Sequence, residues 1–181
     1  MSKRSDSRAA YLLSLLPSER RVLLEKMSER ERHALRSHWQ LWAHEGQLAP
    51  EGDWLGWLIL AGRGFGKTRA GAEWVRAMAE KDGKARIALV GASLGEARSV
   101  MVEGGSGLMA LAPHAQHPKY EPSKRQLQWP NGAQATLFSA GEPESLRGPQ
   151  HSHARWPVPE GRLRQRNHCA SRCLAALCGR S

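Results

Sequence analysis

Residues 61–68 read AGRGFGKT, and they follow directly on the apolar run WLGWLIL at residues 54–60. The eight residues fit the phosphate-loop pattern A/G-x-x-x-x-G-K-S/T. The next stretch, TRAGAEWVRAMAE at residues 68–80, carries apolar side chains at helical spacing. They are Ala70, Trp74, Ala77 and Met78. A chance match in a glycine-rich turn is the alternative, but a buried strand before the loop and a helix after it favour a phosphate loop.

The loop contains the residue types that hold a nucleotide phosphate. Its backbone N–H groups must turn inward around the phosphate, which requires positive φ and leaves no room for Cβ. Gly62, Gly64 and Gly66 are expected to meet this requirement. Lys67 would place a point charge on the β- and γ-phosphates, and Thr68 would offer a hydroxyl to Mg²⁺. The helix that starts there adds its N-terminal partial positive charge.

The composition favours a partner with many negative charges. The 181 residues carry a net charge of +10, which suits nucleic acid. Residues 151–181 contain six Arg and one Glu, so residues 1–150 hold only +5. The alternative interpretation of this charge of +5 is ordinary surface charge that is exposed to solvent. No apolar stretch approaches the roughly 20 residues that span a bilayer, so a membrane is not expected as a partner.

The ends of the sequence bear on the cellular compartment. The stretch MSKRSDSR is polar and no apolar signal-peptide core follows it, so we expect an intracellular protein. Cys169, Cys173 and Cys178 all lie in the last 13 residues. No disulfide framework is therefore expected in the body of the protein. The spacing of these cysteines from His168 fits no common zinc site.

The N-terminal part reads as a helical lead-in, followed by a loop at residues 45–53. Residues 17–19, Pro-Ser-Glu, predict a break and a helix start. An amphipathic helix is expected after it, interrupted by the polar stretch at residues 28–32. Trp39 and Trp42 fit core packing at this spacing, with a stacking platform as the alternative.

The remaining elements predict an α/β fold. Residues 85–93 read as a second strand. Together with the strand expected at residues 54–60 and the helix between them, it implies a crossover and a parallel sheet. Residues 94–102 read as a helix ended by a glycine cluster, and residues 125–138 as a hairpin turning at Pro-Asn-Gly. A polar loop, residues 139–150, follows. We therefore expect an α-helical lead-in at 1–44, part of a phosphate-loop ATPase domain at 45–150, and an irregular basic tail at 151–181.

Three stretches together resemble the large terminase subunit of tailed phages and gene transfer agents, the ATP-driven motor that packages DNA into proheads. They are LWAHEGQLAPEGDWLGWLILAGRGFGKTRAGAEWVR, ARIALVGAS and KYEPSKRQLQWPNGAQATLFSAGEPESLRGPQ, covering about residues 35–150. The resemblance implies a RecA-like sheet, ATP and Mg²⁺ as cofactors, and double-stranded DNA as a partner. It further implies a small terminase subunit and a portal as partners, a homo-oligomeric ring, and the host cytoplasm as location.

The resemblance also assigns roles to single residues. Lys67 and Thr68 resemble the family's phosphate and Mg²⁺ residues. Arg63 resembles a basic loop residue that can neutralise charge developing on the γ-phosphate. Gln47 lies where the family places an adenine-recognising Gln, and Arg147 resembles an arginine inserted into a neighbouring subunit's ATP site. A surface glutamine and a salt-bridged surface arginine are the alternatives. The implied nucleotide-binding residues are Gln47, Gly62, Arg63, Gly64, Phe65, Gly66, Lys67 and Thr68.

The sequence departs from the family after residue 150. There the family has an apolar strand ending in Asp-Glu, whereas here the only later acid is Glu160. The Arg-rich composition suggests a frameshift or truncation, with a natural basic tail as the alternative. We therefore expect weak or absent ATP hydrolysis and no nuclease domain. Competing functions are a non-catalytic basic DNA-binding or assembly protein, or another phosphate-loop NTPase such as a helicase or kinase.

Overall fold

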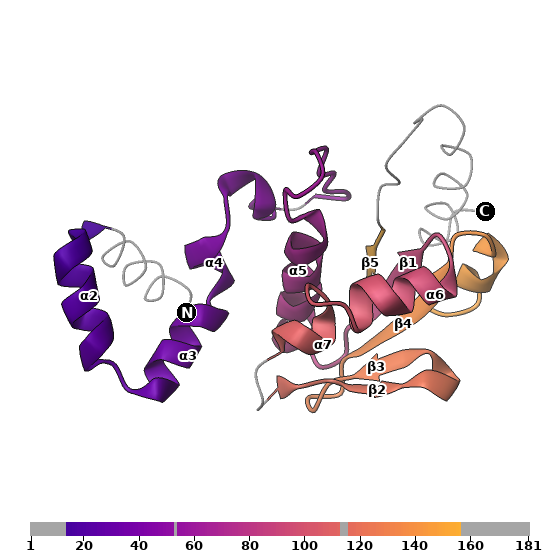
Figure 1. Cartoon of the computed structure of the whole chain (residues 1–181). Helices are drawn as coiled ribbons and strands as arrows, with labels where there is room; N and C mark the ends of the chain where they lie inside the picture. Colours follow the sequence, from indigo (N-terminus) through magenta and orange to yellow (C-terminus); the bar gives the residue numbers. More distant parts are fainter. Residues whose placement is uncertain (1–13, 53, 113–115, 157–181) are drawn as a thin grey trace. The chain divides into compact units, whose positions relative to one another are not determined.

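The computed structural model describes residues 14–52, 54–112 and 116–156 (Figure 1). The chain divides into two compact units, residues 1–48 and residues 49–181. Most of the predicted basic tail, including Glu160 and the three cysteines, lies outside the described residues. The first unit is helical, and the second contains the sheet together with the glycine-rich loop.

In the described part of the first unit, residues 14–48, the structure has three helices and one 3-10 turn. They are α2 (Pro17–Lys26), α3 (Glu29–Ser37), α4 (Trp39–Trp42) and η1 (Glu45–Gln47). Proline stands in the first turn of α2, as predicted. The predicted interruption at residues 28–32 is wrong in extent, because Ser28 caps a new helix. Its backbone N–H donates to Glu31 Oε2 at 2.8 Å, and its Oγ accepts from the Glu31 N–H at 3.3 Å, a reciprocal capping box.

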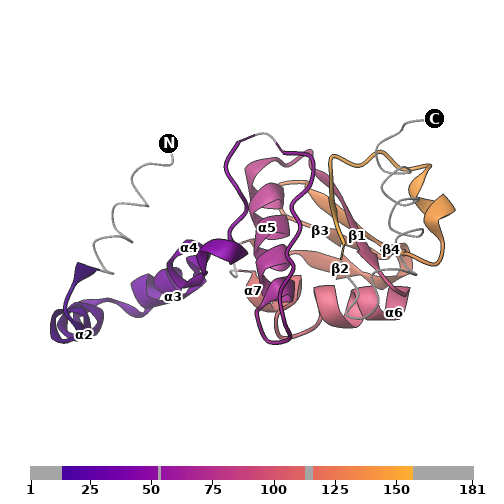
Figure 2. The same cartoon turned by 90° about the horizontal axis from the view of Figure 1, so that it is seen from above.

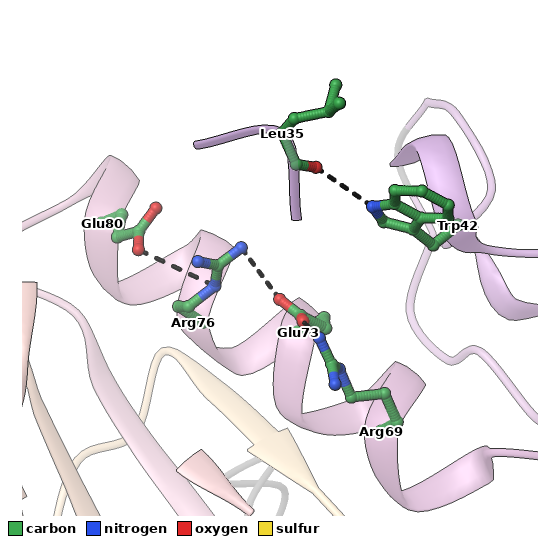
Figure 3. Close-up of polar contacts among 6 residues, drawn as sticks. All are labelled: Leu35, Trp42, Arg69, Glu73, Arg76 and Glu80. Carbon is green, nitrogen blue, oxygen red and sulfur yellow. Dashed lines mark hydrogen bonds and ion pairs between the residues drawn. The ribbon is translucent and has the colours of Figure 1, made fainter. Parts of the chain in front are cut away.

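Trp42 is not the core residue that its spacing predicts. Its ring is 61% exposed, and Nε1 donates to the Leu35 carbonyl at 3.0 Å, a bond within the first unit (Figure 3). The short α4 ends at Trp42, where the chain leaves the helix, and the side chain stays largely exposed.

The second unit is built on a mixed sheet in the order β2-β3-β4-β1-β5. Its strands are β1 (Arg86–Gly91), β2 (Lys119–Glu121), β3 (Gln126–Gln128), β4 (Gln134–Ser139) and β5 (His153–Arg155). The interior strand β1 pairs in parallel with both β4 and β5, whereas β2, β3 and β4 pair antiparallel. The expected α/β class is confirmed, but the sheet is only partly parallel.

Helices lie along the sheet, as Figure 2 shows for α5 and α7. They are α5 (Lys67–Lys81), α6 (Leu94–Glu96), the π-helix η2 (Ala97–Val102) and α7 (Leu108–Leu111), with 3-10 turns η4 (Pro122–Lys124) and η5 (Pro143–Leu146). The predicted helices at 68–80 and 94–102 are therefore confirmed. On α5 the core side chains are Ala72, Val75 and Ala79, while Ala77, predicted on the apolar face, is exposed.

Two apolar clusters lie on the two faces of the sheet. The larger joins α5, η2 and α7 to alternate residues of the strands, including Ile87, Leu89 and Leu137. The smaller contains Ala88, Val90, Phe138 and Leu146. Because side chains alternate along a strand, β1 contributes to both clusters and is buried on both faces.

The apolar run at residues 54–60 does not form the strand that the sequence predicts. It is extended chain without a sheet partner, and Leu55, Leu58 and Leu60 are exposed. The run is instead anchored by Trp54, whose ring packs against Trp74 of α5 at 6.0 Å between centroids.

The strand β5 lies where the sequence predicts only irregular chain. It is anchored next to β1 by Ser152, whose backbone N–H donates to the Arg86 carbonyl at 2.8 Å and whose Oγ accepts from the Arg86 N–H at 3.0 Å. His153 then packs edge-on against Trp74, 5.8 Å between centroids. Residues 153–155 therefore belong to the sheet and not to a tail.

The predicted hairpin is confirmed, and its turn is tied to the end of α5. Gly132 has a φ of 97°, which glycine adopts without strain. Asn131 Nδ2 donates to the Ala79 carbonyl in the last turn of α5 at 2.7 Å, and Oδ1 accepts from the Ala133 N–H at 3.1 Å. Asn131 thus satisfies a terminal helix carbonyl across 52 residues of sequence.

We expect Asn131→Ala to lower the free energy of unfolding by about 1–2 kcal/mol, because both bonds are lost and a helix carbonyl is left without its donor. Urea denaturation measures this. Asn131→Asp is the matched variant, since it keeps the acceptor for Ala133 and loses only the donor to Ala79. Equal midpoints for all three proteins would show that the turn does not stabilise the helix end.

Candidate phosphate-binding site

The glycine-rich loop ends at the first residue of α5. Gly64 and Gly66 have φ of 83° and 88°, the left-handed region that the phosphate-loop hypothesis requires. Gly62 lies outside that region, so the expectation of positive φ there is wrong. A Cβ at Gly62 or Gly64 would meet no atom within 4 Å. The backbone at these two positions is therefore not packed against other atoms on the side where a Cβ would lie.

Lys67 closes the loop. Its Nζ donates to the carbonyls of Ala61 at 2.7 Å and Gly62 at 2.8 Å. These two bonds place a positive charge across the mouth of the loop, directly at the N-terminus of α5. No acidic residue stands in the first turn of this helix, and its N-cap Gly66 supplies no side-chain cap. The first N–H groups of α5 therefore receive no bond from an N-cap side chain, and the first turn has no carboxylate.

Of the other predicted site residues, Arg63 and Phe65 belong to the loop itself, whereas Arg147 and Gln47 lie elsewhere in the chain. Arg63 is exposed on the loop, and Phe65 is half-buried. Arg147 follows η5, is exposed, and pairs with Glu144 at 2.9 Å, which is the surface ion pair given above as the alternative. Gln47 is buried in the first unit, where Oε1 accepts from the His44 N–H at 3.0 Å.

Thr68 occupies the second position of α5, next to Lys67. Among the described residues no group of three or more His, Cys, Asp or Glu could hold a metal ion.

A charged network along α5 was not predicted. Glu73 is 3% exposed, and its Oε1 accepts from Arg69 Nε at 2.8 Å. Its Oε2 pairs with Arg76 Nη2 at 2.9 Å, and Arg76 also reaches Glu80 at 3.8 Å (Figure 3). Burial raises the pKa of Glu80, and Arg76 partly offsets this. The i,i+3 and i,i+4 spacing of these residues was the available sequence signal.

An arginine from the sheet, Arg155, lies beside the first turn of α5. Arg155, the last residue of β5, donates from Nη2 to the Thr68 carbonyl at 2.8 Å. Only 9% of this residue is exposed. Nothing in the sequence indicates this contact, because 87 residues separate the two partners.

These features define an α/β protein with a glycine-rich loop, bridged by a lysine, at the N-terminus of a helix. The family described as "Terminase large subunit, T4likevirus-type, N-terminal" matches residues 58–154. Because this match spans more than half of the chain, the protein belongs to that family. The match includes the loop, α5, β1 to β4 and most of β5, so the family-like sequence extends past residue 150.

The family supports a role as a component of a phage DNA-packaging motor. Terminases are in general ATP-dependent, and the family implies DNA and packaging proteins as partners. No curated protein and no solved structure matches the chain. Within the described residues, none of the helices combines the length and apolar character needed to cross a bilayer.

Proposed function

We propose that the chain is the ATP-binding portion of the packaging motor, and that residues 62–68 hold the phosphates of the nucleotide. The observation that carries the proposal is the position of Lys67, whose Nζ lies across the loop at the N-terminus of α5. A phosphate there would accept bonds from the N-terminal N–H groups and meet the Lys67 charge. The Thr68 hydroxyl would contribute to the Mg²⁺ site.

The residue types fit a polyphosphate. The first turn of α5 has no acidic side chain that would repel an anion. The open loop has room for phosphate oxygens at Gly62 and Gly64, and the positive φ at Gly64 and Gly66 helps to turn N–H groups toward them. We extend the proposal to Arg63 as a further cation for the γ-phosphate, Gln47 for the adenine and Arg147 for a neighbouring subunit's site.

Hydrolysis is proposed to be impaired. Phosphoryl transfer to water needs a positioned group that activates the water. The strand β5, which follows the Arg147 loop, consists of His153, Ala154 and Arg155 and carries no carboxylate. Loss of a general base costs about 10²–10⁴ in rate, whereas the loop and Lys67 still bind.

We expect isothermal titration calorimetry to show MgATP binding to the full chain, while phosphate release stays at background. Absence of binding would overturn the nucleotide-site proposal. Steady phosphate release that depends on the protein would contradict impaired hydrolysis alone. A non-catalytic DNA-binding or assembly protein would instead bind duplex DNA and show no response to MgATP.

A further inference from the structure

Arg155 is held against the helix that follows the loop. It pairs in register with Leu89 of β1, and Leu89 belongs to the apolar cluster on the α5 face of the sheet. Arg155 therefore extends to the same face. Its Nη2 bonds the Thr68 carbonyl at 2.8 Å, and a Cβ added at Gly71 would lie 2.5 Å from its Nε. Two residues of α5 thus fix the position of the guanidinium.

The charge of Arg155 has no counter-ion among the described residues. No ion pair of these residues includes it, and its buried Nη1 has no hydrogen-bond partner. Burial lowers the pKa of Arg155 to about 10, and no neighbouring carboxylate opposes this. Glu73 of α5 differs from Arg155 in this respect, because its buried carboxylate pairs with two arginines. A buried cation without an anion is costly, and proteins seldom keep one without a use.

We propose that Arg155 is a second cation of the phosphate site and that the phosphates of the bound nucleotide supply its missing counter-charge. This inference rests on the proposed function. Thr68 directly follows Lys67, and a helix rises 1.5 Å per residue. A phosphate at the N-terminus of α5 therefore lies within about one helical turn of the carbonyl that Arg155 contacts. The guanidinium itself also lies against Gly71, three residues further along α5, so the phosphate and Arg155 would attract each other through space and not by a direct bond.

The test is Arg155→Met, which removes the charge and keeps much of the apolar stem. We expect the Kd for MgATP to rise about tenfold, the effect of one charge interaction in a site of this kind. The Kd for ADP should rise less, because ADP carries one phosphate fewer. The Tm of the nucleotide-free protein should hold or rise by a few degrees, since an uncompensated buried charge is gone.

Gly71→Ala tests the same contact without removing the arginine. The added methyl group would meet the guanidinium at 2.5 Å and displace it, so we expect weaker MgATP binding in the wild-type background. In the Arg155→Met background the same change should have a smaller effect, because the guanidinium is absent and only the Cδ position, 3.3 Å from the added methyl group, remains close. Arg98→Met is the matched control, since Arg98 is an exposed arginine paired with Glu103 at 2.9 Å. It should leave the Kd unchanged.

The outcomes separate the two proposals. If the wild-type chain does not bind MgATP, the proposed function fails. If it binds, and Lys67→Ala abolishes the binding while Arg155→Met and Gly71→Ala bind as wild type, only the role of Arg155 is overturned. A lowered Tm together with an unchanged Kd for Arg155→Met would show that the arginine is purely structural. Should Arg155→Met not fold, the Kd of Gly71→Ala decides.

Discussion

Replacing Lys67 with alanine is expected to raise the Kd for MgATP about 100-fold, the usual scale for charge-assisted bonds at a phosphate. Two effects combine. The variant loses the ammonium that meets the phosphates, and it also loses the bonds from Nζ to the Ala61 and Gly62 carbonyls that close the loop. Calorimetric titration with MgATP measures the change.

Two variants show whether the position or only the charge of Lys67 matters. Lys67→Arg keeps the charge, but a planar guanidinium does not reproduce the compact ammonium between two carbonyls, so we expect an intermediate Kd. Lys84→Ala removes an exposed lysine of the same unit and should bind as wild type. If Lys67→Ala retained wild-type affinity, the nucleotide would not lie in this loop.

The second large effect is expected at Glu73. Removing its carboxylate by Glu73→Ala leaves Arg69 and Arg76 without the anion that pairs with both. Breaking a buried ion pair from one side typically costs about 3–5 kcal/mol, and the partial exposure of Arg69 puts the loss near 3 kcal/mol. Urea denaturation followed by circular dichroism provides the unfolding free energy.

Glu73→Gln separates charge from volume, because it keeps the shape and one acceptor oxygen. It should lose less than the alanine variant but more than a surface change. Glu121→Ala is the surface control: its pair with Lys124 at 3.2 Å is exposed, and such pairs contribute about 0–1 kcal/mol. A Glu73→Ala protein as stable as this control would mean that the buried network contributes nothing.

Local patterns explain which parts of the fold could be predicted. The helix at 67–81 and the hairpin follow from periodicity and turn chemistry, which depend on neighbouring residues. The run at 54–60 does not form the predicted strand, because apolar character alone does not determine whether the backbone finds a strand to pair with. The short β5 was missed because its pairing depends on Ser152 and Arg86, 66 residues apart.

The same distinction between local and distant contacts applies to the candidate site. The residues within the loop could be named from the motif, because they are contiguous and each residue type has a chemical reason. Arg155 could not, since its contacts with Thr68 and Gly71 arise only when β5 is placed next to β1. Gln47 and Arg147 were named by resemblance, and the structure leaves their proposed roles to experiment.

The position of β1 between β4 and β5 has a consequence for biosynthesis. Ile87 pairs with Ala135 on one side and His153 on the other, so both neighbours are translated long after β1. At about 5–20 residues per second, His153 is added roughly 3–13 s after Ile87. During that interval the apolar residues of β1 lack a partner strand on that side. The nascent chain therefore presents a binding segment to ribosome-associated chaperones, and slower translation of residues 92–152 would lengthen its exposure.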